Sequence, residues 1–323
     1  LVIGQPDLTT CTSGTSQSTL NTPTAIASDG TKLAITDTTN NRVLIYNSIP
    51  TTNGVSPDVV VGQPDFNTSS AGTTQSKFSN PRGVSLYSNK LIVGERGNYR
   101  TTIFNSIPTT NGASADVVLG QSDFTSASTS PPSTASTNQP FFIHVDGKGR
   151  LYVADRPASR YLIWNSIPAS NNTSADIVIG QPDFTTTTAN NGGVAAHSVG
   201  NAKGIFANDT QMVIADQANN RILIFNNVEK KPGLTLNNAP DGRENNKVRL
   251  KGTATVDSPY TIKNVEFSVN GDSFSGATAT DGSFDETSDE YYFDFTPTSN
   301  QPKDSNGILI DGYTVRVKAT NNN

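Results

Sequence analysis

Short apolar runs alternate with polar, turn-forming stretches along most of this chain, and the alternation has a regular period. In the first full period the apolar runs are PTAIASDG (23–30), KLAITD (32–37), RVLIYN (42–47) and DVVVGQ (58–63). Each run is short, rich in β-branched residues and bounded by Asn, Gly, Asp or Pro, which is typical of β-strands joined by turns. The pattern predicts four strands in each period and favours an all-β fold.

Three sequence columns repeat with this period. The string VIGQPD returns three times, with its first glycine at Gly4, Gly62, Gly120 and Gly180. The string IYNSIP also returns three times, with its asparagine at Asn47, Asn105, Asn165 and Asn226. In the third column an acid precedes an arginine by five residues, in the pairs Asp37/Arg42, Glu95/Arg100, Asp155/Arg160 and Asp216/Arg221. The chain therefore contains four copies of one structural unit.

Four strands per unit are typical of a propeller blade, because a lone four-stranded sheet must stack on neighbours to bury its apolar faces. The segments LAITDTTNNRVLIYN (33–47) and MVIADQANNRILIFN (212–226) resemble the core of NHL repeats, and the NSIP…GQPDF tail resembles a bacterial variety found in large secreted or surface proteins. The resemblance covers residues 1–228 and implies a β-propeller of four NHL-like four-stranded blades. It departs at Gly94–Glu95 and at Pro157–Ser159, where we expect locally different hairpins.

The way in which the propeller closes has two interpretations. The chain opens on LVIGQ, which has the sequence of an outermost strand, and the fourth unit ends after its third strand at Phe225. We expect residues 1–5 to complete the fourth blade and to close a four-bladed ring. The alternative is that further blades precede Leu1, so that the four units are part of a larger propeller.

The pattern changes after Val228. Residues 229–245 are polar and turn-rich, and we interpret them as a linker. In residues 246–323 apolar and polar positions alternate, most clearly in YTVRVKA (313–319), which predicts a small antiparallel β-sandwich. This part resembles the bacterial immunoglobulin-like modules found along extracellular proteins, and the resemblance implies a spacer.

Composition and charge narrow the range of functions. The net charge is −5, made up of −1 in residues 1–230 and −4 in residues 231–323, and no basic stripe is present. Nucleic acid is therefore not an expected partner. No apolar run approaches the roughly 20 residues of a membrane-spanning helix, and Cys11 is the single cysteine, so no internal disulfide forms. We interpret the chain as a piece of a longer polypeptide with further domains.

Two repeated columns carry polar side chains of interest. The acid–arginine pairs named above flank a hairpin turn, and we expect them to stabilise the blade rather than to form a site. The glutamine of the GQPD string is a candidate for ligand binding, at Gln5, Gln63, Gln121 and Gln181. The alternative is that each amide binds nearby backbone groups.

Catalytic and metal sites have weaker support. His144, His197 and Cys11 are scattered without the spacing of zinc ligands, and no nucleophile-elbow motif is present. We therefore expect no enzyme and no cofactor. The one metal candidate is calcium in the acidic stretch TDGSFDETSDE (280–290), with Asp281, Asp285 and Asp289 as ligands.

The longest polar stretches, such as residues 125–139, connect one unit to the next and gather on one face of the disc. We expect that face to bind a protein or a glycan, in a non-catalytic scaffold or adhesion protein located outside the cell or on its surface. The alternative is a propeller enzyme of the lactonase or lyase type, with metal or carboxylate groups at the axis.

Overall fold

The computed structural model describes residues 1–129, 131–208 and 210–226, and in the remainder 233–236, 242–244, 247–255, 262–269, 275–279, 283, 288–295 and 315–321. The chain divides into two compact units, Leu1–Asn226 and Asn227–Asn323, and each unit is described by itself. Helical structure in the described residues is confined to two short 3-10 helices, η1 (Ala189–Gly192) and η2 (Gln217–Asn219).

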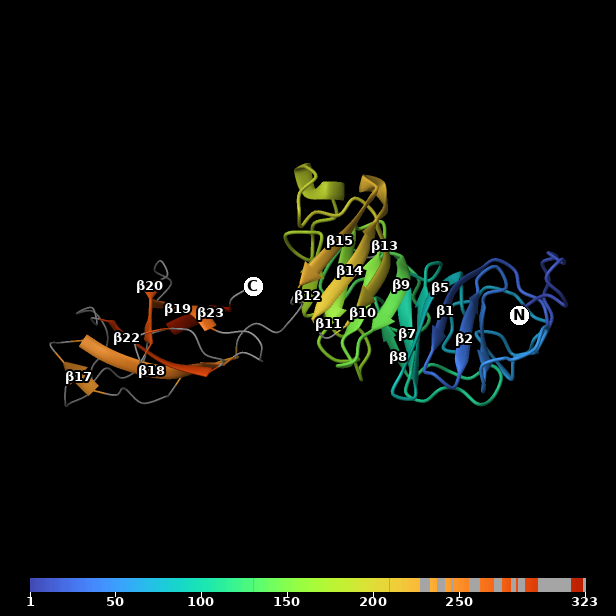
Figure 1. Ribbon diagram of the computed structural model, residues 1–323, viewed down its shortest axis with the longest axis horizontal. Coiled ribbons are helices and arrows are strands. Elements are labelled where there is room, and N and C mark those ends of the chain that lie inside the picture. Colours follow the sequence, from blue (N-terminus) through green and yellow to red (C-terminus); the bar gives the residue numbers. More distant parts are fainter. Residues whose placement is uncertain are drawn as a thin grey trace. The chain divides into compact units, whose positions relative to one another are not determined.

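Four antiparallel sheets follow one another along the first unit as the blades of a β-propeller (Figure 1). Blade one contains β1 (Pro23–Ser28), β2 (Leu33–Asp37), β3 (Arg42–Tyr46) and β4 (Val59–Val61). Blade two contains β5 (Pro81–Tyr87), β6 (Lys90–Glu95), β7 (Arg100–Phe104) and β8 (Val117–Leu119). Blade three contains β9 (Pro140–Val145), β10 (Leu151–Asp155), β11 (Arg160–Trp164) and β12 (Ile177–Ile179). Blade four contains β13 (Ala202–Ala207), β14 (Gln211–Asp216) and β15 (Arg221–Asn226).

The hydrophobic core lies between the blades. Between blades one and two, Val43 and Ile45 pack in one cluster with Val84 and Phe104. A second cluster between blades two and three includes Trp164. The innermost strands β1, β5, β9 and β13 lie side by side in this order, whereas β13 and β1 form no comparable contact. Successive sheets therefore bury the faces that they turn toward one another, as expected for stacked blades.

The hairpin between the second and third strands has the same form in every blade. The residue before each arginine adopts a left-handed conformation, with φ of 51° at Asn41, 53° at Tyr99, 50° at Ser159 and 52° at Asn220. The register then pairs the acid with the arginine, as in Asp37 opposite Arg42. Our expectation of locally different hairpins in the second and third units is wrong, because Tyr99 and Ser159 adopt the turn conformation that Asn favours.

The expectation that residues 1–5 complete the fourth blade is also wrong. The sheet of blade four contains only β13, β14 and β15. Val2 instead accepts a hydrogen bond from the Gly54 amide and donates one to Asn53 Oδ1, each at 3.0 Å. Val60 makes the same two contacts with the loop of blade two. The N-terminal residues therefore take the position of an outer strand that precedes blade one.

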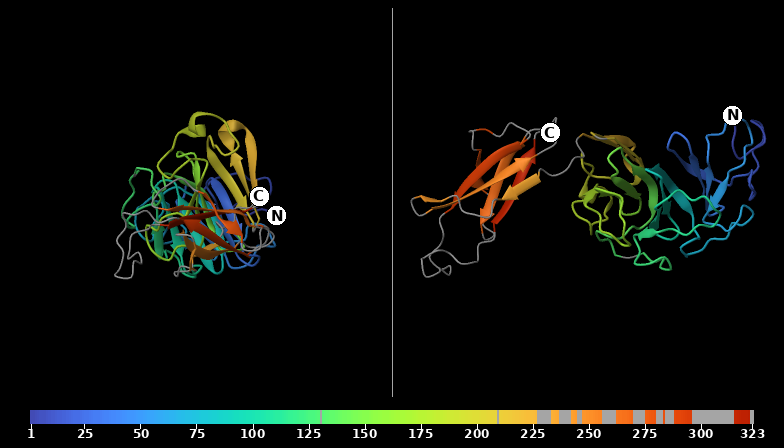
Figure 2. Two further views of the ribbon diagram at one scale, coloured as in Figure 1. Left: turned by 90° about the vertical axis from the view of Figure 1, so that its left-hand side faces the viewer. Right: turned by 90° about the horizontal axis from the view of Figure 1, so that it is seen from below.

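In the second unit the described strands form two antiparallel sheets (Figure 2). One sheet contains β16 (Gly233–Leu236), β17 (Gly242–Glu244), β18 (Lys247–Thr255), β21 (Thr278–Ala279) and β22 (Ser288–Phe295). The other contains β19 (Ile262–Val269), β20 (Ser275–Gly276) and β23 (Val315–Asn321). The interpretation of residues 229–245 as a linker needs correction, because β16 and β17 lie within it and pair with β18. Strands pair through backbone hydrogen bonds, which do not require apolar side chains. The polar composition of residues 229–245 therefore did not reveal these two strands.

Candidate functional site

The acid and the arginine of the third repeated column form an ion pair in all four blades. The distances are 2.7 Å for Arg42 Nε to Asp37, 2.9 Å for Arg100 to Glu95, 3.0 Å for Arg160 to Asp155 and 2.8 Å for Arg221 to Asp216. The first three pairs are fully buried. They lie inside the blades and do not line the propeller axis.

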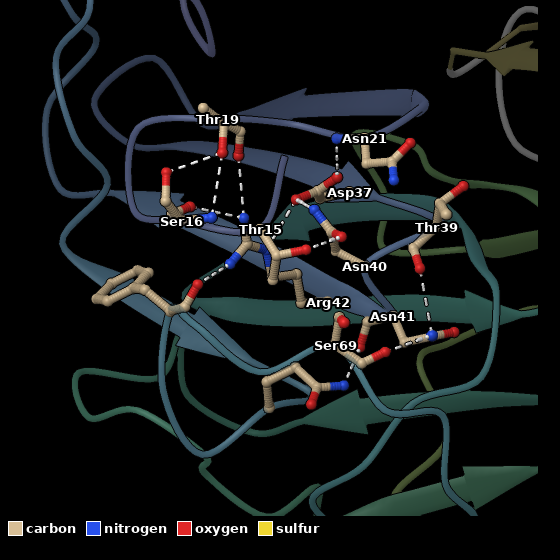
Figure 3. A network of polar contacts seen from close by, with 12 residues as sticks. Thr15, Ser16, Thr19, Asn21, Asp37, Thr39, Asn40, Asn41, Arg42 and Ser69 are labelled. Atoms are coloured by element: carbon tan, nitrogen blue, oxygen red, sulfur yellow. Dashed lines mark hydrogen bonds and ion pairs between the residues drawn. The ribbon is translucent and has the colours of Figure 1, made fainter. Parts of the chain in front are cut away.

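Each arginine also holds the connection that leads into its blade. Figure 3 shows the network of blade one, in which Arg42 donates to the backbone carbonyls of Ser16 and Thr19 as well as to Asp37. Asn40 donates to the same oxygen of Asp37 as Arg42 Nε, at 2.8 Å, and the other oxygen accepts from the Asn21 amide. Arg100 makes the equivalent contacts in blade two. The pair thus links the hairpin to a long polar connection that has little apolar surface of its own.

The repeated glutamines also bind backbone groups. Gln63 Nε2 donates to the carbonyls of Asn41 and Ser70, each at 3.0 Å, and the amides of the other copies donate in a similar way. The other three glutamines are Gln5, Gln121 and Gln181. The Nε2 groups are engaged within the fold, which fits the alternative that each amide binds nearby backbone groups, whereas Oε1 of Gln63 and of Gln181 is buried without a hydrogen-bond partner. The ligand-binding role stays a prediction.

The aspartate of the same string closes a turn. Asp7 accepts hydrogen bonds from the amide and hydroxyl groups of Thr9 and Thr10, which lower its pKa to about 2. Asp183 makes the same contacts with Thr185 and Thr186, and its pKa is also lowered to about 2. These carboxylates are therefore ionised turn residues.

A separate cluster of positive charge lies where the inner strands begin. Arg82 and Lys203 are the second residues of β5 and β13, whereas Arg96 and Arg156 directly follow β6 and β10. Because antiparallel neighbours begin and end at the same edge, all four residues lie at one end of the propeller axis. The long connections between blades end at this same face. We call these four residues the cationic cluster.

An aromatic ring lies at the centre of the cationic cluster. Lys203 Nζ is 4.0 Å from the centroid of the Phe141 ring, and the guanidinium carbons of Arg82 and Arg156 are 5.2 and 5.3 Å from it. These distances are in the range of cation–π contacts. Phe141 occupies in β9 the position that Arg82 and Lys203 occupy in their strands.

The guanidinium groups are held by neutral amides. Arg82 Nε donates to Asn80, at 2.9 Å, and Arg96 and Arg156 donate to Gln139 and Asn201 of the next blade. Within the described part of the chain, no carboxylate forms an ion pair with a member of the cationic cluster. The cluster therefore has positioned cations and no counter-charge.

The electrostatic cost of this arrangement is visible in the pKa values. Burial lowers the pKa of Arg82, and the nearby charges of Arg96 and Arg156 lower it further. The pKa of Lys203 is lowered by burial and then by the positive charges of Arg156, Arg82 and Arg96. A bound anion would relieve both the repulsion and the incomplete solvation.

The sequence analysis missed the cationic cluster because it followed the conserved columns of the repeat. The relevant signal lies in two variable columns. The residue after the first residue of the inner strand is Thr24, Arg82, Phe141 or Lys203. The residue after the repeated acid is Thr38, Arg96, Arg156 or Gln217. A position that differs between otherwise regular blades does not serve a structural role that all blades share.

A cavity of about 470 Å³ lies along the axis between the inner strands β1, β5 and β9, with Ile205 of β13 also lining it. Its lining is mixed, with apolar side chains beside the hydroxyl groups of Thr24, Ser28 and Ser85 and the imidazole of His144. The lining of this cavity includes neither paired carboxylates nor a set of metal ligands. The enzyme alternative, which has metal or carboxylate groups at the axis, stays a prediction.

His144 should make the propeller sensitive to acid. Its Nε2 lies 2.6 Å from the carbonyl oxygen of Ala207, and burial lowers the pKa of the imidazole, although this contact and Asp146 act in the opposite direction. The unfolded chain therefore binds a proton at higher pH than the folded chain, so stability falls as the pH decreases below about 6.5. We expect H144Q to reduce this loss between about pH 7 and pH 5 in thermal unfolding. H197Q, at the exposed second histidine, is the control, and an equal effect of both variants would contradict the assignment.

The calcium candidate falls mostly outside the described residues. This applies to Asp281 and Asp285, whereas Asp289 lies in β22, where its backbone is opposite Ala254. In the part of the chain that is described, no group of three or more His, Cys, Asp or Glu residues could hold a metal ion. Calcium binding in this stretch stays a prediction.

No protein-family model and no curated protein matches the chain. Among solved structures, a nidogen/laminin complex matches with a TM-score of 0.40 and 14% identity, over 64% of this chain and 60% of that chain. A glutaminyl cyclase of Myxococcus xanthus matches with a TM-score of 0.36 and 13% identity, over 64% of this chain and 73% of that chain. Virginiamycin B lyase of Staphylococcus aureus matches with a TM-score of 0.28 and 11% identity, over 84% and 94%.

These similarities concern the fold alone, and the chain spans 60% of the length of the matching chain in the nidogen/laminin complex. The similar structures include both a protein complex and enzymes, so they do not select a function. Over the described residues, no helix is long and apolar enough to cross a membrane. The class that the structure defines is a four-bladed β-propeller with a cationic axial end.

Proposed function

We propose that this chain is a non-catalytic binding protein of the cell exterior or cell surface, whose propeller binds an acidic group of a protein or glycan at the cationic cluster. The observation that carries the proposal is the convergence of Arg82, Arg156 and Lys203 around one aromatic ring, with the charge of Arg96 close by and with no ion pair to a carboxylate among the described residues. On the sequence resemblance, we further infer that the blades are NHL-like and that the second unit is an immunoglobulin-like spacer.

The chemistry of the cluster supports binding rather than turnover. Arginine stays protonated in proteins and therefore does not act as a general base, and the side chains of Asn80, Gln139 and Asn201 that accept from the three guanidinium groups are neutral amides. A guanidinium group is well suited to carboxylate or sulfate, because its parallel N–H groups match two oxygens of the anion. The Nε contacts of Arg82, Arg96 and Arg156 fix these forks before a ligand arrives.

We expect K203Q and R82Q each to weaken the binding of an acidic ligand by about tenfold or more, since each removes a charge-assisted contact. The probes are a poly-glutamate peptide and a sulfated oligosaccharide, titrated calorimetrically into the full chain at two salt concentrations. The peptide represents protein carboxylates, and the oligosaccharide represents acidic glycans.

K90Q is the matched control. Lys90 begins β6, at the opposite end of the strand from Arg96, and its Nζ donates to Asn105. The control makes the same change in net charge but leaves the cationic cluster intact. If K90Q weakened binding as much as K203Q, the interaction would reflect net charge alone, and if neither probe bound the unmodified chain, the proposal would be rejected.

A further inference from the structure

Blade one exposes a face that its counterparts in the other blades bury. Ile26 is 72% exposed, whereas Val84, at the same register position of blade two, is 4% exposed. The next equivalent residue, Ile143, is also buried. Ile49 is exposed in the same way, although Ile107 of the next unit is buried. These residues are the ones that pack on a preceding blade.

Blade four exposes the opposite face. Ile222 and Ile224 are each 60% exposed, whereas Val43 and Ile45, their equivalents one and three residues after the arginine, are 0% exposed. The large ring of Phe206 on β13 is exposed as well. In blade one these positions pack on blade two, so β15 and β13 present a surface that lacks its following blade.

The two faces have complementary shapes. Between blades two and three, Ile143 fills the space above Gly83 and Gly94, so closely that a methyl group on Gly83 would lie 2.8 Å from Ile143 Cγ1. On blade four the equivalent glycine is Gly204, and the nearest atom to a methyl group there would be Ala215 Cβ, at 3.8 Å. A cavity of about 530 Å³ is open beside these two residues and Ile222. Blade four therefore has the socket, and Ile26 of blade one is the residue that would fill it.

Blade four has no outer strand in the described residues, whereas the N-terminal residues beside blade one take the position of such a strand. Among the described residues, β15 is an edge strand of its three-stranded sheet, which has no outer strand of the kind found in the first three blades. At the other end, Val2 already takes the position of an outer strand that precedes blade one, through its contacts with Asn53 and Gly54. By the register of blade one, in which Leu44 is opposite Val60, Val2 would lie opposite Leu223.

We propose that the occupant of these faces is a second copy of this chain. Blade one of the second copy packs on blade four of the first, Ile26 enters the socket at Gly204 and Ala215, and residues 1–3 run beside β15. This contact continues the interface that is already present between successive blades. It is heterologous, so it leaves a free face at each end until a ring closes. Ile26, Gly204, Ala215 and Ile222 do not belong to the cationic cluster, although Lys203 and Phe141 line the same cavity as Gly204. The test of association therefore uses substitutions outside that cluster.

The first test is the mass of the full chain in solution, measured by light scattering or sedimentation over a wide concentration range. We expect assemblies of more than one 34.2 kDa chain. I26D and I222D should each weaken the association by about 100-fold or more, because an unpaired carboxylate would be buried in the contact. V194D is the control, since Val194 is exposed to a similar degree in the connection before β13.

A crosslinking test determines which faces meet. In a C11S background, which removes the exposed native thiol, chains with I26C are mixed with chains with G204C under oxidising conditions. We expect a disulfide-linked pair in the mixture and not in either variant alone. Far-UV circular dichroism and the fluorescence of Trp164 monitor folding, and both substituted positions have free space in a single chain.

Three results would overturn the proposal. The unmodified chain could have the mass of a single copy at every concentration, which would assign the faces to blades of a longer polypeptide. G204C chains could crosslink with each other, which would indicate a symmetric contact between fourth blades. V194D could weaken the association as much as I26D, which would indicate non-specific aggregation. Failure of anion binding would leave these results unaffected.

Discussion

Replacing Arg100 by methionine is expected to destabilise the propeller by about 3–5 kcal/mol, because it leaves the carboxylate of Glu95 buried without its partner. The side chains of Glu95 and Arg100 are both 0% exposed. Arg100 also donates to the backbone carbonyls of Thr74, Lys77 and Phe124. Thr74 and Lys77 lie in the connection before blade two and Phe124 lies in the connection after it, so the loss extends beyond one hairpin.

The equivalent change in blade four should be milder. The side chain of Arg221 is 25% exposed, so water can solvate the Asp216 carboxylate in part after R221M, and we expect a loss of about 1–2 kcal/mol. A double variant, E95L with R100M, should be more stable than R100M alone, because it removes the unpaired charge. Urea unfolding followed by the fluorescence of Trp164, the single tryptophan, measures all three variants. Equal losses for R100M and R221M would show that burial does not set the cost.

The blade itself could be predicted from the sequence because its features are local. The acid and the arginine lie on neighbouring strands of one hairpin, so a spacing of five residues is enough to bring Asp37 opposite Arg42. The turn that contains Asp7 needs only the hydroxyl residues two and three positions later. Because the unit occurs four times, the sequence alone was enough to predict a β-propeller.

The arrangement at the axis could not be predicted in the same way. Arg82 and Arg156 belong to different blades, and both contact Phe141 of β9. Because these residues are far apart in the sequence, no short sequence motif could predict the cationic cluster. The prediction that residues 1–5 complete the fourth blade was wrong for a similar reason. The sequence of residues 1–5 identifies an outer strand correctly, but the blade to which an outer strand belongs depends on its three-dimensional neighbours, here Asn53 and Gly54.

The glycine of the GQPD string gives the second large effect, and G62A is expected to cost about 3 kcal/mol or more. Gly62 has a φ of 88°, a conformation that side chains rarely adopt. A methyl group there would lie 2.2 Å from Cδ2 of Phe78, whose ring is buried between blades one and two. Both the strained backbone and the overpacked core contribute.

G30A separates these two contributions. Gly30 has nearly the same conformation, with a φ of 91°, but no atom lies within 4 Å of the place that a methyl group would take. We expect G30A to cost about 1 kcal/mol, which is the backbone contribution alone. The difference between the two variants in urea unfolding is then the cost of moving Phe78. If G62A and G30A lowered the free energy of unfolding by the same amount, Gly62 would be required for its backbone conformation only. The packing of Phe78 against Gly62 would then have no measurable role in joining the blades.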